Sequence, residues 1–490
     1  MLHPTRADIL GTLMPGFVGT ELPDWLAALL SQGLGGVCLF GGNISTREQT
    51  AALTAQILAA NPDAIIAIDE EGGDVTRLYY DRGAPYPGNA LLGRIDELEL
   101  TERTARAVGR QLREVGVNCT FAPDADVNSN PDNPVIGVRS FGTDPQKVAD
   151  QTAAWVSAVQ ATGVAASAKH FPGHGDTAQD SHLALPVVDR SLDELREREL
   201  VPFAAAIAAG TELVMTSHIL LPQVDPDHPA TMSATVLQGL LRGELGFEGV
   251  IVSDALDMKG ASGEIGIPAA AARALAAGVD LLCIGTDNSA EQLEEIAAVV
   301  TAAVADGALP AERVEDAAAR VRALAARLHE RAEHALLPPA PAPEPDFDLG
   351  QIARGFDVSA HARDWIAAAL GEYELVRIDS VNNIAVGEAP WGLFSAGAVA
   401  DAVVAPGGPV RAGDALAALG PRPVAIVGKD IHRRSYAREL VDAARAERGA
   451  DVLVIDMGWP GDDRAYADVA TFGASRLVGS ALIHLLEGPA

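Results

Sequence analysis

The stretch VAASAKHFPGHGDTAQDSH, residues 164–182, joins an apolar run of small residues to a loop that is dense in ionisable groups. Residues 164–168 have the length and composition of a buried strand, and the proline and glycines that follow end regular structure. Three histidines, two aspartates and one lysine then fall within residues 169–182. Neither a core nor an ordinary surface requires this density, so the loop is a candidate functional site at the end of a strand.

The same alternation of a short apolar run with a longer helical stretch recurs along the first two thirds of the chain. Parallel βα units produce this pattern, because their strands are buried on both faces and their crossovers are helices. Eight such units within residues 1–335 favour a (β/α)8 TIM barrel over an open doubly wound sheet. The predicted strands cover residues 10–17, 36–40, 64–68, 117–122, 164–168, 213–217, 249–253 and 279–284.

The last part of the chain predicts a second, smaller domain. A long amphipathic helix is expected over residues 313–333, and a proline-rich linker, extended and semi-rigid, over residues 336–346. Residues 347–490 alternate apolar runs with helical stretches, which predicts a three-layer αβα domain. Its strands are expected at 374–378, 423–429 and 451–457, its helices at 437–446 and 473–486, with TFGASR at 471–476 as a helix start packing within its own domain.

Polar residues follow six of the eight predicted barrel strands, and in TIM barrels the chemistry lies at these carboxyl ends. Recurrence at six strand ends favours a shared function over isolated turn or capping residues. Asp254 closes the run GVIVSD, where a buried carboxylate is costly unless it is used or hydrogen-bonded, although capping of the next helix would also explain it. The strand-end residues are Asp69, Asp124, Asp126, Lys169, His170, His218, Asp254 and Asp287.

The composition excludes some partners and indicates a compartment. A formal charge of −31, from 36 basic and 67 acidic residues, argues against a grip on nucleic acid or an anionic membrane. Cys38, Cys119 and Cys283 each lie in an apolar run, so we expect buried free thiols in a reducing cytoplasm. No export signal and no membrane-spanning run is visible in the sequence.

The loop of residues 169–182 permits two chemical interpretations. In the first, His170, His174, Asp176, Asp180 and His182 are ligands of a metal ion in a barrel hydrolase. In the second, Asp180 hydrogen-bonds one nitrogen of His182, so that the other nitrogen exchanges protons with a substrate. The spacing does not separate the two interpretations, but the cation of Lys169 beside His170 would oppose a bound divalent ion.

Five segments together resemble glycoside hydrolase family 3, in its β-N-acetylglucosaminidase branch. The resemblance covers residues from about 10 to 330 and is weaker in the second domain. Two positions depart from the family pattern, since Asp74 stands where arginine is common and Glu70 where glutamine is common. The segments are IDEEGGDVTR at 68–77, NPVIGVRSFG at 133–142, KHFPGHGDTAQDSH at 169–182, VMTSHI at 214–219 and VSDALDM at 252–258.

The resemblance implies a retaining glycosidase that needs no metal and no other cofactor. Asp254 matches the nucleophile that forms a covalent glycosyl-enzyme, and His182 matches the acid/base of this branch, oriented by Asp180. The implied substrate carries terminal non-reducing β-linked N-acetylglucosamine, as in peptidoglycan fragments recycled from the cell wall. The residues implied to hold the sugar hydroxyls are Asp69, Arg77, Arg139, Lys169 and His170.

Four alternatives remain open from the sequence. A neutral histidine in place of a carboxylate removes a charge that repels phosphate, so a phosphorylase is one. The others are a dual β-glucosidase and hexosaminidase, a catalytically dead sugar-binding protein and a metal-dependent barrel hydrolase. For the active enzyme we expect His170 to be ordered near the barrel axis and His182 to lie on a mobile, glycine-hinged arm.

Overall fold

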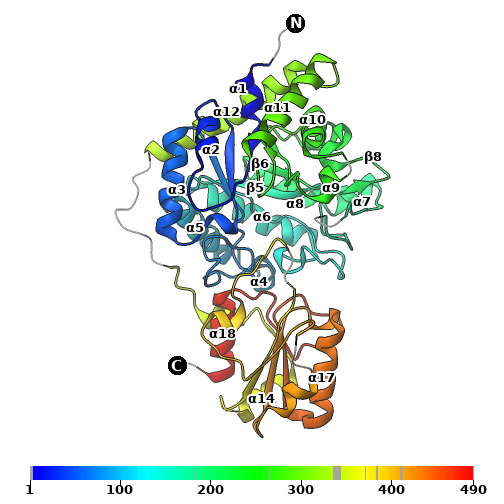
Figure 1. Ribbon diagram of the computed structural model, residues 1–490. Helices are drawn as coiled ribbons and strands as arrows, with labels where there is room; N and C mark the ends of the chain where they lie inside the picture. The colour runs from blue at the N-terminus through cyan, green and yellow to red at the C-terminus, as the bar shows by residue number, and fades with distance from the viewer. Residues whose placement is uncertain are drawn as a thin grey trace. The chain divides into compact units, whose positions relative to one another are not determined.

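The computed structural model describes residues 4–181, 184–263, 265–334, 344–369, 371–381, 384–408 and 412–488. The chain divides into two compact units (Figure 1). Unit 2 includes two segments from the amino-terminal half of the chain, and after each of them the chain continues in unit 1. Unit 1 comprises Met1–Glu71, Leu98–Ile136 and Gly142–Pro343, and unit 2 comprises Gly72–Glu97, Gly137–Phe141 and Glu344–Ala490.

Unit 1 is a closed barrel of parallel strands. Six strands pair in the order β2-β3-β4-β5-β6-β9, and β1 pairs in parallel with β10. A bridge from Val252 to Leu281 joins β9 to β10, and the Cys38 amide donates to Pro15 O at 3.0 Å, which joins β2 to the β1 segment. Among the described residues the barrel strands are β1 (Leu13–Met14), β2 (Gly36–Leu39), β3 (Ile65–Ile68), β4 (Cys119–Thr120), β5 (Ala165–Phe171), β6 (Leu213–Thr216), β9 (Val250–Val252) and β10 (Leu282–Cys283).

The predicted (β/α)8 barrel is therefore confirmed, and each predicted strand region overlaps one of its strands. Strand β5 continues past the predicted end to Phe171, so Lys169 and His170 belong to the strand and not to the loop that follows it. The prediction for residues 10–17 was wrong at its start, because Leu10 lies in helix α1 (Arg6–Gly11). The reason is a capping box formed by Thr5 and Asp8, which precede the apolar run. The Thr5 hydroxyl accepts from the Asp8 amide, and the Asp8 carboxylate accepts from the Thr5 amide at 2.9 Å, so the helix begins before the strand can.

Helices surround the strands of unit 1 (Figure 1). Helix α12 is the long amphipathic helix predicted over residues 313–333, and its buried Val321, Leu324 and Leu328 join the core inside the barrel. The helices between and after the strands include α2 (Asp24–Leu30), α3 (Arg47–Ala60), α5 (Leu98–Glu114), α6 (Pro145–Gln160), α7 (Leu192–Glu197), α8 (Leu200–Ala208), α9 (Lys259–Ser262), α10 (Ile267–Ala277), α11 (Ala290–Ala305) and α12 (Ala311–His334).

Unit 2 contains a second sheet, in the order β11-β16-β15-β14-β12-β13. All neighbours are parallel except β11, which pairs antiparallel with β16. Helices α17 and α18 lie on opposite sides of this sheet (Figure 1), which confirms the predicted three-layer domain. The elements are β11 (Asp357–Val358), α14 (Ala360–Ala369), β12 (Glu374–Ile378), β13 (Ala402–Val404), α16 (Ala412–Ala417), β14 (Val424–Gly428), α17 (Ser435–Arg448), β15 (Val452–Asp456), β16 (Val469–Ala470) and α18 (Arg476–Glu487).

The segment Gly72–Glu97, which carries α4 (Asn89–Ile95), packs on the start of α18 inside unit 2. Asp74 Oδ1 accepts from the Ala474 amide at 2.7 Å, and the Ser475 hydroxyl donates to Tyr86 O at 2.6 Å. Ser475 is also the N-cap of α18. The unusual Asp74 therefore has a structural partner in the TFGASR segment, and that segment starts a helix as predicted. Residues 336–343 of the predicted linker lie outside the described residues.

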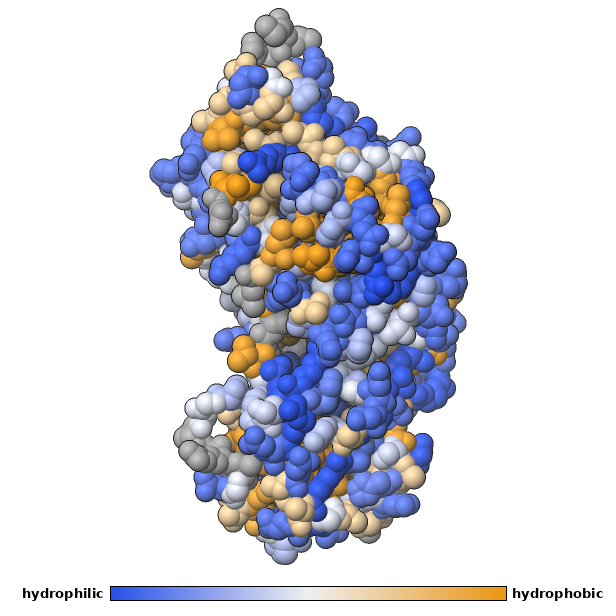
Figure 2. All heavy atoms as spheres, turned by 90° about the vertical axis from the view of Figure 1, so that its right-hand side faces the viewer, coloured by the Kyte–Doolittle hydropathy of each residue, from blue (hydrophilic) through white to orange (hydrophobic). Residues whose placement is uncertain are grey.

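The surface is largely hydrophilic on the face seen in Figure 2, where apolar residues gather only in limited patches. This agrees with a charged fraction of 21% in which acidic residues predominate. In the part of the chain that the structure describes, we find no helix with the length and apolarity needed to cross a membrane.

Candidate active site

The alternation of side chains along the barrel strands places three of the predicted residues. Ala67, Ala165 and Val252 belong to the core inside the barrel. Side chains two residues apart on a strand share a face, so Asp69 and Asp254 continue this inward face just past the ends of β3 and β9. Lys169, four residues after Ala165 on β5, follows the same rule. The residues therefore converge at the carboxyl end of the barrel, where TIM-barrel enzymes carry their chemistry.

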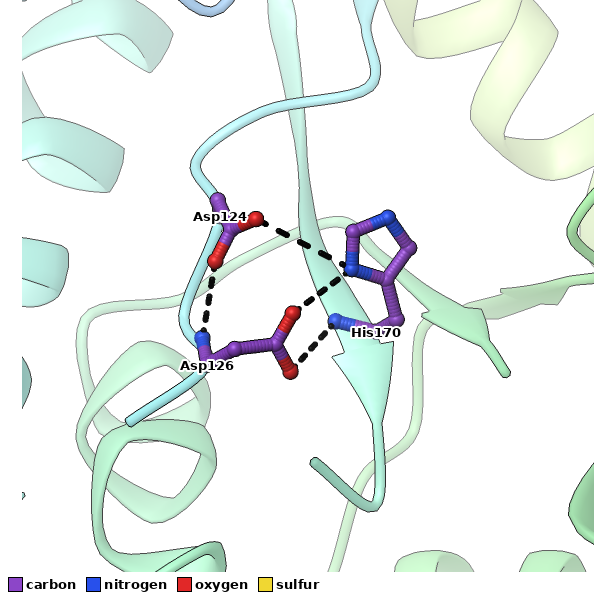
Figure 3. A group of neighbouring side chains, drawn as sticks. All are labelled: Asp124, Asp126 and His170. Carbon is purple, nitrogen blue, oxygen red and sulfur yellow. Dashed lines mark hydrogen bonds and ion pairs between the residues drawn. The ribbon is translucent and has the colours of Figure 1, made fainter. Parts of the chain in front are cut away.

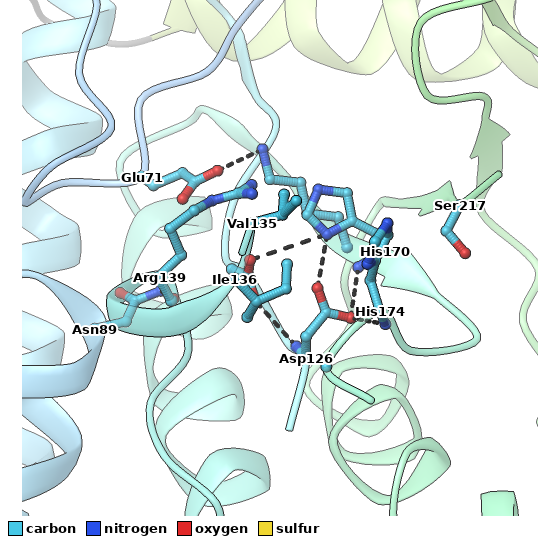
Figure 4. Close-up of polar contacts among 12 residues, drawn as sticks. Glu71, Asn89, Asp126, Val135, Ile136, Arg139, His170, His174 and Ser217 are labelled. Atoms are coloured by element: carbon cyan, nitrogen blue, oxygen red, sulfur yellow. Dashed lines mark hydrogen bonds and ion pairs between the residues drawn. The ribbon is translucent and has the colours of Figure 1, made fainter. Parts of the chain in front are cut away.

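Lys169 forms the first cluster at this end. Its side chain is 3% exposed, and its ammonium contacts Asp69 Oδ1 at 2.6 Å and Glu71 Oε1 at 2.7 Å. Two carboxylates thus compensate one buried cation, as burial of a charge requires. Figure 4 shows Glu71 directed toward this ammonium. Glu71 was not among the predicted site residues, although it stands two residues after Asp69 at the end of the same strand.

Asp126 and His170 form the second cluster, shown in Figure 3. Asp126 Oδ2 lies 2.7 Å from His170 Nδ1, and its Oδ1 accepts from the His170 and His174 amides at 3.2 and 2.6 Å. Asp124 lies farther from the same ring nitrogen, at 3.9 Å, and its Oδ1 accepts from the Asp126 amide at 3.0 Å. The prediction placed His170 at the end of β5 but assigned no role to Asp126, which the strand-end sequence PDAD already contained.

These three side chains also have the spacing of metal ligands. One ligand atom from each of Asp124, Asp126 and His170 falls within 4.8 Å of the others, and among the described residues this group alone does so. The hydrogen bonds give the arrangement another explanation, because the Asp126 carboxylate already accepts three N–H groups. The predicted metal set included Asp176, which instead accepts from Arg190 Nε at 2.8 Å and Arg198 Nη2 at 2.7 Å.

His174 is buried in a polar network beside this cluster. Its Nδ1 lies 2.8 Å from the Thr177 hydroxyl and its Nε2 lies 3.1 Å from the Ser181 hydroxyl. Burial, together with the charge of His170, lowers the pKa of His174 to about 4, while nearby Asp126 and Asp254 oppose the shift. His174 is therefore neutral at physiological pH and serves as a hydrogen-bonding brace within the loop.

This pKa predicts a pH dependence of stability. Between pH 6.5 and about 4 the unfolded chain binds a proton at His174 that the folded protein does not, so unfolding becomes easier as the pH falls. A shift of this size corresponds to on the order of 3 kcal/mol. We expect the free energy of unfolding to fall by about that much more in the wild type than in His174→Asn over this range, measured by urea titration.

The control for this measurement is His228→Asn, which changes an exposed histidine of β8 (Asp225–Pro229). It should keep the pH dependence of the wild type. If the free energy of unfolding fell equally in the wild type and in His174→Asn between pH 6.5 and about 4, His174 would not be the source of the pH dependence.

The predicted acid/base pair is only partly within the described residues. Asp180 is described, and its backbone carbonyl accepts from the Ala184 amide at 3.1 Å. His182 lies outside the described residues, so the pairing with Asp180 and the mobile arm stay predictions. Ser181, which precedes His182 in the sequence, is buried, and its carbonyl accepts from the Gly260 amide at 3.1 Å. The loop is thus tied to the segment that follows Asp254.

Asp254 is partly exposed at the end of β9. Its Oδ1 accepts from the adjacent Ala255 amide at 2.8 Å. The alternative role as a helix cap is wrong, because α9 begins at Lys259 with Met258 at its N-cap position. The strand-end residue His218 supports this segment instead, since its Nε2 lies 3.1 Å from Ala255 O. A partly exposed carboxylate on a braced strand end is suited to attack a bound substrate.

Arg77 and Arg139, two further predicted sugar-binding residues, belong to unit 2. Both are buried. Arg77 Nη2 donates to Ala385 O at 2.7 Å, and Arg139 O accepts from Asn89 Nδ2 at 2.7 Å (Figure 4). Within unit 1 the structure brings Asp69 to Lys169, and it holds these two arginines by contacts inside unit 2.

A closed (β/α)8 barrel with carboxylates, a lysine and histidines at the carboxyl ends of its strands defines a TIM-barrel enzyme. The model of the glycosyl hydrolase family 3 N terminal domain matches residues 20–324. The chain belongs to glycoside hydrolase family 3, which confirms the family predicted from the motifs.

The relatives agree with this assignment. A beta-hexosaminidase of Stenotrophomonas maltophilia (strain R551-3) is 41% identical in an alignment of 282 residues, and the match covers 56% of this chain and 82% of that protein. Beta-hexosaminidase A of Pseudoalteromonas piscicida is 38% identical in an alignment of 335 residues, and the match covers 63% of this chain and only 56% of that protein. A family 3 beta-N-acetylglucosaminidase structure from Paenibacillus sp. str. FPU-7 superposes with a TM-score of 0.87 at 30% identity, covering 99% of this chain and 97% of that one.

Proposed function

We propose that the protein is a retaining exo-β-N-acetylglucosaminidase that removes terminal, non-reducing β-linked N-acetylglucosamine. The observation that carries the proposal is the position of Asp254, a braced and partly exposed carboxylate at the carboxyl end of β9. The named activities of the relatives support the choice of sugar. A sugar-binding protein without activity would not need a carboxylate presented in this way.

The proposed reaction has two steps. In the first, the Asp254 carboxylate attacks the anomeric carbon, the glycosidic bond breaks, and His182 donates a proton to the departing oxygen. In the second, His182 takes a proton from water, and the water oxygen displaces Asp254 to release the sugar. Asp180 stabilises the imidazolium of the first step and orients the imidazole of the second.

The sugar is held by charged and polar groups in this proposal. Lys169 donates and Asp69 accepts, and their mutual contact at 2.6 Å fixes both before the substrate arrives. His170 is fixed by Asp126. The family motifs assign Arg77 and Arg139 to the same sugar, since their guanidinium groups donate several hydrogen bonds in a planar array.

Terminal N-acetylglucosamine on peptidoglycan fragments is the substrate class we propose, within a recycling route in the cytoplasm. Cys38, Cys119 and Cys283 are buried free thiols, which suits a reducing compartment. Burial raises the pKa of the Cys119 thiol well above its usual range, so this thiol stays protonated and unreactive.

Hydrolysis is favoured over phosphorolysis by the charges at the barrel mouth. Within unit 1 the described strand ends carry five carboxylates, at Asp69, Glu71, Asp124, Asp126 and Asp254. In the contacts described above they face the cation of Lys169 and, when it is protonated, His170. Phosphate is a dianion near neutral pH, and a surplus of negative charge raises the cost of bringing it to the glycosyl-enzyme. Water meets no such barrier.

The test measures the products formed from an aryl N-acetylglucosaminide, an aryl glucoside and a muropeptide fragment, each with and without inorganic phosphate. We expect free N-acetylglucosamine as the main product, at a rate that phosphate does not change, and slower turnover of the glucoside. A sugar 1-phosphate as the main product would identify a phosphorylase instead. Activity lost to a chelator and restored by zinc would favour the metal-dependent alternative.

A further inference from the structure

Asp126 holds the segment around His170 through several contacts. It is fully buried in the loop after β4, and its carboxylate accepts from three N–H groups, all on His170 and His174. One carboxylate therefore fixes the imidazole of His170 and the backbone on both sides of residues 171–173. Only a group without hydrogens can satisfy all three donors at once.

The contact with the ring settles which nitrogen of His170 carries the proton. The two backbone amides that donate to Asp126 Oδ1 favour the ionised form of its carboxyl group. An ionised carboxylate only accepts, so at 2.7 Å the proton must sit on Nδ1 of His170. In the neutral ring Nε2 then carries a lone pair and acts as an acceptor.

We propose that Asp126 is a positioning residue that makes His170 a hydrogen-bond acceptor toward the sugar. The inference rests on the proposed function, in which His170 contacts a sugar hydroxyl. A hydroxyl that accepts from a cation such as Lys169 has to pass its own hydrogen to an acceptor. The acceptor is Nε2 of His170. Asp126 makes it available by keeping the ring proton on Nδ1, the nitrogen that faces the carboxylate.

Asp124 provides a matched comparison. It belongs to the same cluster, but it lies 3.9 Å from His170 Nδ1, beyond hydrogen-bonding distance. Its Oδ1 accepts from the Asp126 amide, a contact that the oxygen of an asparagine can keep. Asp124→Asn therefore removes one negative charge from the cluster without changing the group that faces Nδ1.

The decisive variant is Asp126→Asn, which has the same shape. Its single carboxamide oxygen is required by the two backbone amides of His170 and His174, so its NH2 group must face His170 Nδ1. Nδ1 then has to accept, and the proton moves to Nε2. The substitution thus reverses the polarity that His170 offers the sugar, while the fold of the loop is kept.

The experiment combines a spectrum with kinetics. In protein labelled with 15N-histidine, with His170 assigned from the difference spectrum of His170→Gln, we expect the proton on Nδ1 in the wild type and in Asp124→Asn, and on Nε2 in Asp126→Asn. The value of kcat/KM on an aryl N-acetylglucosaminide should fall about 10- to 100-fold in Asp126→Asn, mainly through KM, and less in Asp124→Asn.

Substrates with fluorine at C3, C4 or C6 identify the hydroxyl concerned, because fluorine only accepts. The fluorinated sugar at that position should lose less in Asp126→Asn than in the wild type. A proton on Nε2 in the wild-type protein would overturn the proposal, whether or not the variant folds, and so would unchanged kcat/KM in a variant with the reversed tautomer. A wild type that cleaves no N-acetylglucosaminide would refute the proposed function alone, since the tautomer is measured in the free protein.

Discussion

Asp254→Ala is expected to reduce kcat/KM on every N-acetylglucosaminide by about 10⁴-fold or more, the scale on which nucleophilic residues act. The loss has two causes. No covalent glycosyl-enzyme can form, and the positive charge that develops at the anomeric carbon loses the carboxylate that faces it. The measurement is release of the aryl group under saturating and subsaturating substrate, with folding checked by thermal unfolding.

Asp257→Asn is the matched control, because it changes a carboxylate of the same loop that is exposed and contacts the Thr286 amide at 3.0 Å. It should stay near wild-type activity. Azide added to Asp254→Ala should restore turnover and give a glycosyl azide of inverted configuration, as expected when an external anion takes the place of the nucleophile. Turnover of Asp254→Ala at the wild-type rate, without azide, would end the assignment of Asp254.

The barrel could be predicted from the sequence because each of its strands and helices leaves a pattern within a short stretch of the chain. Strands such as β3 and β9 are continuous apolar runs with helices between them, and this pattern survives without knowledge of any contact. In the sheet of unit 2, the strands that were not predicted are β11, β13 and β16, each of two or three residues. Runs this short carry no periodicity, and only pairing with a neighbour defines them as strands.

The site was predicted where a motif names a residue and missed where a distant contact defines the role. Glu71 is recognisable only through Lys169, and Asp126 only through His170. The division into units was also beyond the sequence, because the contact of Asp74 with Ala474 spans 400 positions. A local pattern cannot show which of two units a loop will join.

The proposed acid/base role of His182 predicts a loss of activity that depends on the leaving group. His182→Ala should lower kcat/KM about 10²- to 10⁴-fold on substrates with a poor leaving group, the range of general acid catalysis. A dinitrophenyl glycoside should be affected much less in its glycosylation step, because its leaving group departs without a proton. The comparison is made with a series of aryl substrates of increasing leaving-group pKa.

The slope of that series separates a proton donor from a residue that only supports the loop. Loss of a donor makes the rate depend steeply on the leaving group and removes the limb of the pH profile that reports its titration, whereas a displaced loop slows all substrates alike. His228→Ala, which removes an exposed histidine, should change neither. Equal losses across the series in His182→Ala would assign the proton transfer to another group and would end the proposed role of Asp180 as the residue that orients His182.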